Sequence, residues 1–187
     1  MSNKSTITST VGYMCLALTG WMLSMPNAGW FEKLYGHGSA MMFPLAVVLV
    51  VMGILAFLNE QTLDAIIFFG GAGLFWAGHE YRVVSALSAN EEPLHYTAWY
   101  FFIWAVFFFY VWLGSFSEGA VRMLFLLGLW LTLLALAINA WMGAHALLIV
   151  GGYLGLVTSI LAALTSATTV VTRRSELVSA RPRAQPA

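Results

Sequence analysis

Long apolar runs alternate with short polar breaks along this chain. Six runs approach the roughly 20 apolar residues that a helix needs to cross a bilayer, and we expect spans at 11–25 (extending back to 6–10), 40–58, 63–87, 96–116, 122–141 and 146–172. The last two are separate helices, because the charge-free stretch 123–172 would be about twice as long as a bilayer is thick if it formed one helix. The pattern predicts an all-α integral membrane protein with six transmembrane helices.

Turn-forming residues mark the breaks between the runs. Pro26-Asn27-Ala28-Gly29 ends the first run, and Met142-Gly143-Ala144-His145 divides the last two, since Pro and Gly are typical of turns. We expect three parts in the chain: a cytoplasmic N-terminal tail at 1–10, a six-helix membrane domain at 11–172, and a flexible basic cytoplasmic tail at 173–187.

Two kinds of residue indicate how the helices pack. Glycines gather in the third run (Gly70, Gly71, Gly73) and in the sixth (Gly151, Gly152, Gly155), and positions without a Cβ let helices approach closely. The fourth run is aromatic on every side. Some of its rings must therefore face lipid and others another helix or subunit.

Composition strengthens the membrane assignment. Hydrophobic residues make up 60% of the chain and charged residues 9%, whereas soluble domains have about 45–50% apolar and about 25% charged residues. The eight acidic and eight basic residues leave no net charge to attract a polyanion. Disordered, nucleic-acid-binding and ordinary cytosolic proteins are excluded.

The basic residues predict the orientation. Six spans put both termini on one side, and that side collects Lys4, Arg122, Arg173, Arg174, Arg181 and Arg183, against Lys33 and Arg82 on the other. Because positive charge accumulates in the cytoplasm, we expect both termini of this multi-pass protein there.

Few ionisable residues fall within the spans, where each is a functional hypothesis because it is costly. We expect Asp64 to be wetted beside its turn. His79 and Glu80 would line a vestibule or tune proton access, with Arg82 nearby, unless they form a solvated helix end. The four histidines are scattered, so we expect no metal site, no cofactor and no enzymatic activity.

Neutral groups remain to line a pore through the spans. Thr19 and Thr132 supply hydroxyls, and the amide of Asn139 can both donate and accept hydrogen bonds. An interhelical hydrogen bond is the alternative role for Asn139. A pore narrowed by apolar rings would select solutes by size and hydration.

The order of several segments resembles the acetate uptake transporter family. The segments are Asn27-Ala28-Gly29-Trp30-Phe31, Gly73-Leu74-Phe75-Trp76, Trp104-Ala105-Val106-Phe107, Gly119-Ala120-Val121-Arg122, 131–138 and Gly152-Tyr153-Leu154-Gly155. The resemblance covers about 12–172. The family's Asn-Pro-Ala-Pro-Leu-Gly signature corresponds to 7–12, where Gly12 alone is retained.

The resemblance implies a six-helix protomer with its own pore, assembled as a hexameric ring. The family's constriction residues correspond to Leu16, Ala72 and Leu131, where Leu16 replaces Phe and Ala72 replaces Tyr. Phe75 and Trp76 join Thr19, Thr132 and Asn139 along the implied substrate path.

We therefore predict a channel or transporter of the bacterial inner membrane for short monocarboxylates such as acetate, or for succinate. Its partners would be the lipid bilayer and further copies of the chain in a homo-hexamer, and no nucleic acid. Two alternatives stay open. One is a channel for neutral solutes such as urea, amides or ammonia. The other is a non-transporting membrane subunit that binds a partner through its aromatic fourth span.

Overall fold

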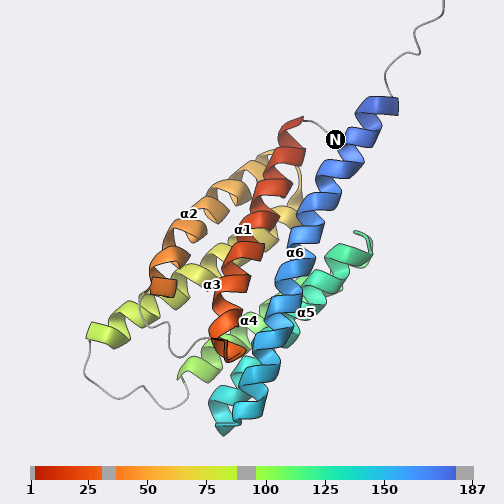
Figure 1. Cartoon of the computed structure of the whole chain (residues 1–187). Helices are drawn as coiled ribbons and strands as arrows, with labels where there is room; N and C mark the ends of the chain where they lie inside the picture. Colours follow the sequence, from red (N-terminus) through yellow and green to blue (C-terminus); the bar gives the residue numbers. More distant parts are fainter. Residues whose placement is uncertain (1–2, 31–36, 88–95, 180–187) are drawn as a thin grey trace, which may run out of the picture.

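Each predicted run forms a helix in the computed structural model, which describes residues 3–30, 37–87 and 96–179 and the side chains of 5–30, 43–78 and 96–172. The helices are α1 (Asn3–Asn27), α2 (His37–Leu58), α3 (Thr62–Leu87), α4 (Tyr96–Leu113), α5 (Ala120–Met142) and α6 (His145–Ser179). They form one elongated bundle (Figure 1). The all-α, six-helix expectation is confirmed over the described ranges.

The two predicted tails are longer than the structure allows. Helix α1 begins at Asn3, so most of the expected tail 1–10 is helical. Its small polar side chains, including Ser5, Thr8 and Ser9, are buried, because neighbouring helices cover them. Helix α6 likewise continues to Ser179, so the expected tail 173–187 is helical over 173–179, and the remainder lies outside the described residues.

Four described helical segments are long and apolar enough to cross a bilayer: Ser5–Asn27, Tyr96–Leu113, Ala120–Met142 and His145–Thr172. Helices α2 and α3 contain shorter apolar stretches, Phe43–Leu58 and Thr62–Gly78, within their described side chains. The predicted division of the charge-free stretch is confirmed, since Gly143 follows α5 with a left-handed φ of 65° and its N–H donates to the carbonyl of Asn139 at 2.8 Å.

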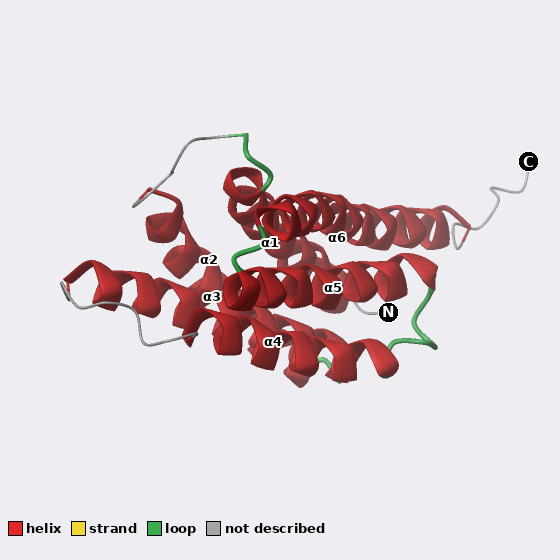
Figure 2. Ribbon diagram, turned by 90° about the horizontal axis from the view of Figure 1, so that it is seen from below, coloured by secondary structure: helices red, strands yellow, loops and turns green. Residues whose placement is uncertain are grey.

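Helix α6 is central to the packing. It runs alongside α1 and α5, while α2 packs mainly on α3 (Figure 1). Figure 2 shows α5 lying between α4 and α6, which agrees with the contacts of α5 on both sides. The bundle therefore brings α1 and α5, far apart in sequence, to either side of α6.

Glycines set how closely α6 approaches α1. A Cβ added at Gly20 of α1 would lie 2.7 Å from the Oγ of Ser159 in α6, and one at Gly155 of α6 would overlap the hydroxyl of Ser24. A Cβ at Gly152 would meet the backbone of Ala28 itself. This confirms the predicted role of small residues in close helix approach.

Glycines of α3 instead make room for aromatic rings of α4. A Cβ at Gly73 would lie 2.7 Å from the ring of Trp104, and one at Gly70 would overlap Phe107. On α4 itself Phe108 is fully buried whereas Tyr110 is 73% exposed. The aromatic helix thus presents rings both to its neighbours and to the outer surface, as the sequence predicts.

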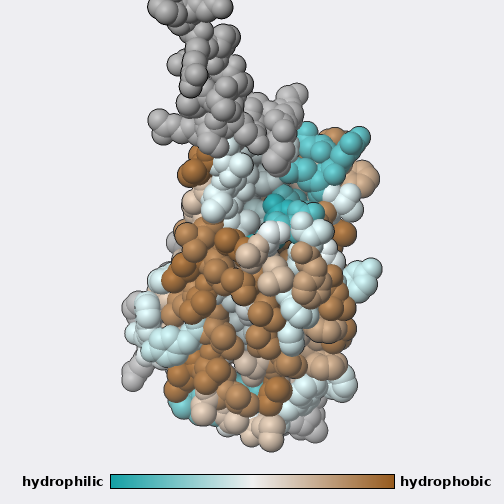
Figure 3. Space-filling view, turned by 90° about the vertical axis from the view of Figure 1, so that its right-hand side faces the viewer, coloured by the Kyte–Doolittle hydropathy of each residue, from teal (hydrophilic) through white to brown (hydrophobic). Residues whose placement is uncertain are grey.

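The outer surface is apolar over the middle of the bundle. Figure 3 shows a broad hydrophobic band and hydrophilic residues gathered towards one end. Exposed apolar side chains of α6 include Val157, Ile160 and Leu164. Such a band suits contact with lipid. Charged side chains are found at the polar end.

Candidate functional site

Asp64 is the centre of a polar cluster at one end of the bundle. It lies in the first turn of α3, and its side chain is only 2% exposed. Ser9 of α1 donates to Asp64 Oδ2 at 2.5 Å, and Tyr13 donates to Oδ1 at 2.9 Å. Residues four apart share a helix face, so α1 presents both hydroxyls to one carboxylate. The expectation that Asp64 is wetted by the interface is wrong, because α1 covers it.

The cluster extends to the turn before α3. Gln61 donates from Nε2 to the Oγ of Ser9 at 2.9 Å, so Ser9 accepts one hydrogen bond while it donates another. The Oε1 atom of Gln61 is buried without a hydrogen-bond partner. Side-chain hydrogen bonds therefore join α1, the turn before α3 and the first turn of α3.

Arg122 brings α5 into the same cluster. Its Nη1 atom lies 3.4 Å from Asp64 Oδ1 and 2.5 Å from Glu118 Oε2. The guanidinium carbon also lies 5.5 Å from the centre of the Tyr13 ring, within the range of a cation–π contact. Arg122 thus contacts two carboxylates and the ring of Tyr13 in α1.

The two carboxylates differ in their surroundings. Asp64 is enclosed and has two O–H donors besides Arg122, and such pairing offsets the large cost of burying a charge. The side chain of Glu118 is 39% exposed and lies before α5 in the connection from α4. Asp64 therefore neutralises Arg122 inside the protein, and Glu118 is a second, surplus anion at the surface.

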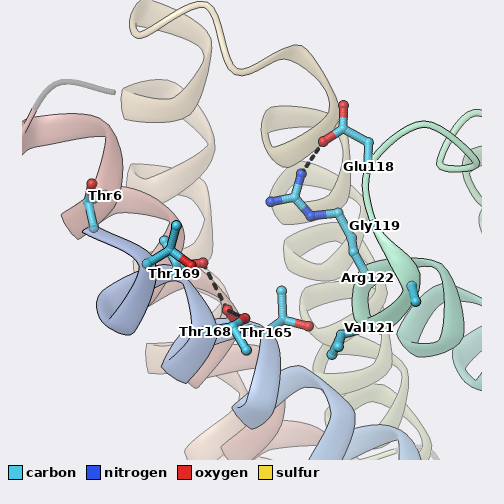
Figure 4. A pocket seen from close by; sticks show the side chains of 10 residues that line it. Thr6, Glu118, Gly119, Val121, Arg122, Thr165, Thr168 and Thr169 are labelled. Carbon is cyan, nitrogen blue, oxygen red and sulfur yellow. Dashed lines mark hydrogen bonds and ion pairs between the residues drawn. The ribbon is translucent and has the colours of Figure 1, made fainter. Parts of the chain in front are cut away.

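A cavity of about 300 Å³ opens beside this ion pair (Figure 4). It is lined by Thr6 of α1, by the segment 118–122, and by Thr165, Thr168, Thr169 and Thr172 of α6. Thr165 and Thr169 donate to carbonyls of their own helix at 2.8 Å. Thr168 likewise donates to the carbonyl of Thr165 at 3.1 Å. The site therefore combines one guanidinium with threonines whose hydroxyl protons are directed to their own helix.

The order of the helices along the chain is a sequence signal for this pairing. In a bundle of antiparallel spans, the first turns of the first, third and fifth helices lie at the same end. Asp64 and Arg122 begin the third and fifth helices, and Ser9 lies early in the first. Because an unpaired charge in an apolar bundle is costly, two opposite charges at the same end are expected to pair.

Two of the three predicted constriction residues are buried in the core. Leu16 (5% exposed) and Ala72 (3% exposed) belong to one buried apolar cluster. A Cβ at Gly71, next to Ala72, would lie 2.6 Å from Leu16 Cδ2, which places α1 against α3 here. Leu131 of α5 is half-buried and lies outside that cluster as the described residues define it.

The hydroxyls of the predicted substrate path are bonded within their own helices. Thr19 is buried and donates to the carbonyl of Cys15 at 2.8 Å. Thr132 is also buried and donates to the carbonyl of Gly128 at 2.7 Å. Each hydroxyl oxygen can still accept a hydrogen bond. Asn139 is half-buried near the end of α5.

The other predicted site residues occupy different surroundings. Phe75 is buried in the apolar core. Trp76 is 40% exposed, and its ring centre lies 4.8 Å from that of Phe43 in α2. His79 and Glu80 lie in the second half of α3, away from the end that holds Asp64, and their side chains fall outside the described ones.

Comparison with protein families decides the relationship. The model of the GPR1/FUN34/yaaH family matches residues 2–186. This chain belongs to that family. The resemblance to acetate uptake transporters found in the sequence is thereby confirmed, and so is a multi-pass membrane protein. No curated protein matches the chain.

A solved structure shares the fold of this family member. The bacterial acetate channel SatP superposes with a TM-score of 0.84 over 93% of this chain and 94% of its own. The two sequences are 20% identical, so the likeness concerns the fold. The arrangement of six helices is therefore that of a known channel, while the side chains differ at most positions.

Proposed function

We propose that this protein is a channel or transporter that carries acetate and related short carboxylates across a membrane. The observation that carries the proposal is the family match, which spans nearly the entire chain. The shared fold with an acetate channel supports it. The apolar outer band and the bilayer-length helices place the protein where such transport occurs.

The interior suits a weakly hydrated solute better than a bare ion. In the described residues between the two ends of the bundle, the buried polar groups are hydroxyls such as Thr19, Thr132 and Ser159. We place the constriction at Leu16 and Ala72, with Leu131 as its third member. A carboxylate would lose part of its hydration there. The amide of Asn139 would donate a replacement hydrogen bond, and Thr132 would do so once its hydroxyl turns away from the carbonyl of Gly128.

Ala72 is the residue that most affects the proposed constriction. It is a small side chain in the position where the family has a tyrosine, and it lies beside Gly71 in α3. Because Gly71 and Ala72 are both small, Leu16 is the largest side chain at this depth of the proposed pore. We therefore expect a wider or differently gated passage than in relatives with an aromatic ring.

We further propose a homo-hexamer in the bacterial inner membrane with both termini in the cytoplasm. The exposed apolar residues of α4, among them Trp99, Ile103 and Val106, supply a surface that a neighbouring protomer could cover. In this orientation the Asp64 cluster is at the cytoplasmic end. His79 and Glu80 would then serve the opposite vestibule.

The test is uptake of labelled acetate into proteoliposomes. We expect saturable flux above that of empty liposomes, and we expect Leu131→Trp to reduce it at least tenfold, because an indole would fill the constriction. Leu164→Trp is the matched control, since Leu164 is 47% exposed on α6 and the same substitution there faces lipid.

The outcomes separate the candidate functions. Flux of urea that is independent of pH, without flux of acetate, would replace the carboxylate assignment by a neutral-solute channel. Absence of flux for both solutes would favour a non-transporting subunit. Equal loss of acetate flux in Leu131→Trp and Leu164→Trp would show that Leu131 is not part of the constriction.

A further inference from the structure

Arg122 is a single cationic side chain that lies between two carboxylates. One guanidinium lies between Asp64 at 3.4 Å and Glu118 at 2.5 Å, so the group carries a net charge of minus one when all three are ionised. Asp64 is fixed by two hydroxyls and is almost fully enclosed. The carboxylate that can leave is therefore Glu118.

Glu118 is attached in a way that permits it to leave. It precedes α5 and follows a short turn in which its own N–H donates to the carbonyl of Ser115 at 3.0 Å. Its side chain is 39% exposed, and Arg122 is its ion-pair partner, four residues along the chain. Exposed pairs of this type contribute little to stability.

The space beside the pair is large enough for a small anion. The cavity of about 300 Å³ is lined by both Glu118 and Arg122 and by four threonines of α6. Figure 4 shows Glu118 and Arg122 on one side of this space and the threonines facing them from α6. Its volume is at the lower end of small-molecule sites, which are about 300–1,000 Å³.

We propose that this cavity is a carboxylate-binding site at the end of the bundle that holds Asp64, in which Glu118 occupies the place of the ligand and yields it to an incoming carboxylate. The inference rests on the proposed function for the identity of the ligand. Exchange of one carboxylate for another leaves the charge in direct contact with Arg122 unchanged, while the displaced Glu118 turns into solvent. Asp64 keeps the guanidinium in position during the exchange.

Competition between Glu118 and the free carboxylate lowers the affinity of the site. A tethered carboxylate competes at an effective concentration in the millimolar range or above, so the free ligand binds only when it is abundant. A channel site must also release what it binds. Glu118 thus acts as an internal competitor that sets the affinity of this site.

Thermal denaturation of the purified full-length protein in detergent measures binding directly, since a ligand of the folded state raises its stability. The probe is sodium acetate at constant ionic strength, with acetamide as the uncharged analogue. For Glu118→Gln we expect half-maximal stabilisation at an acetate concentration about tenfold lower than in the wild type. Acetamide should have no such effect.

Two variants make the result specific. Glu60→Gln is the matched control, because Glu60 is exposed in the turn before α3 and carries the same charge. It should behave as the wild type. Arg122→Lys keeps the positive charge beside Asp64 but loses the planar fork that binds carboxylates bidentately, and we expect acetate binding at least tenfold weaker.

Flux in proteoliposomes gives the second measurement. The acetate concentration that gives half-maximal flux should fall several-fold in Glu118→Gln and stay unchanged in Glu60→Gln. If the wild type carries acetate and the two glutamate variants behave alike in both assays, the inference is wrong and the proposed function stands. Equal stabilisation by acetamide and acetate would also overturn it.

The reverse result is equally distinct. If the wild type carries no acetate, the proposed function fails. Acetate-dependent stabilisation that is strengthened in Glu118→Gln and weakened in Arg122→Lys would then still support the carboxylate site, with another acid as its natural ligand.

Discussion

The Asp64 cluster and the α1–α6 interface bury polar groups in opposite ways. In the cluster, side chains bond to side chains of other helices, as Ser9 and Arg122 do with Asp64. At the interface, hydroxyls such as that of Ser159 bond to their own helix, here to the carbonyl of Gly155 at 2.7 Å, and Ser166 of α6 adds one bond across it, to the carbonyl of Thr10 in α1 at 2.9 Å. The first region is held mainly by directed electrostatic contacts and the second mainly by shape.

The difference follows from the chemistry of the groups. A hydroxyl can be satisfied by the carbonyl four residues earlier, so it needs nothing from a neighbouring helix except space. A carboxylate has no such local partner and must find donors elsewhere. Glycine therefore determines the fit of α1 on α6, whereas charge and hydrogen bonds join the starts of α1, α3 and α5, which the antiparallel order brings to one end.

Removal of the positive charge from the cluster should have the largest effect on stability. Arg122→Met keeps an apolar stem of similar length but leaves Asp64 as a buried anion without a cation. We expect a loss of about 3–5 kcal/mol in the free energy of unfolding, measured by denaturation in detergent. The double variant Asp64→Asn/Arg122→Met should recover most of it, and equal losses in both would show that Asp64 is not what Arg122 neutralises.

A methyl group at the α1–α6 interface should come next. Gly152→Ala places a Cβ against the backbone of Ala28, which cannot rotate away. We expect a loss of about 3 kcal/mol, the upper end for overpacking. Gly151→Ala is the neighbouring control, because its Cβ would lie 3.2 Å from the flexible tip of Leu136, and it should cost under about 1 kcal/mol. Similar losses in the two variants would mean that shape does not set this interface.

One substitution made in both regions gives the finest comparison. Ser9 and Ser159 are both buried, yet Ser9→Ala removes a donor to a carboxylate and an acceptor for Gln61, while Ser159→Ala removes a bond within one helix. We expect a loss of about 1.5–3 kcal/mol for Ser9→Ala and no more than about 1 kcal/mol for Ser159→Ala. A thermal-shift assay on both proteins checks the difference, and its reversal would overturn the distinction.

The sequence predicted the helices well and their ends less well. Hydropathy identified all six, and Gly143 marked the boundary between α5 and α6. It did not predict that α1 starts at Asn3, because Ser5, Thr8 and Ser9 look like an exposed tail until other helices are seen to cover them. Polarity indicates contact with water only where no neighbour offers a partner.

The site was harder to predict than the fold. The resemblance to a family suggested Leu16, Ala72 and Leu131, and the structure buries the first two in the core. The Asp64–Arg122 pair was missed, since its members are far apart in the chain and each taken alone looked like a charge at the end of a span. Their roles depend on a pairing that no local pattern contains.

What the sequence determined by itself is the membrane setting: apolar runs long enough for a bilayer, turns at Pro and Gly, and an interior nearly free of charge. These are properties of neighbouring residues and of helix length. The tertiary structure alone decided that Ser9, Tyr13, Asp64 and Arg122 form one cluster beside a cavity. Residues more than fifty positions apart meet through packing, because burial forces each charge to find whichever partner the bundle brings within reach.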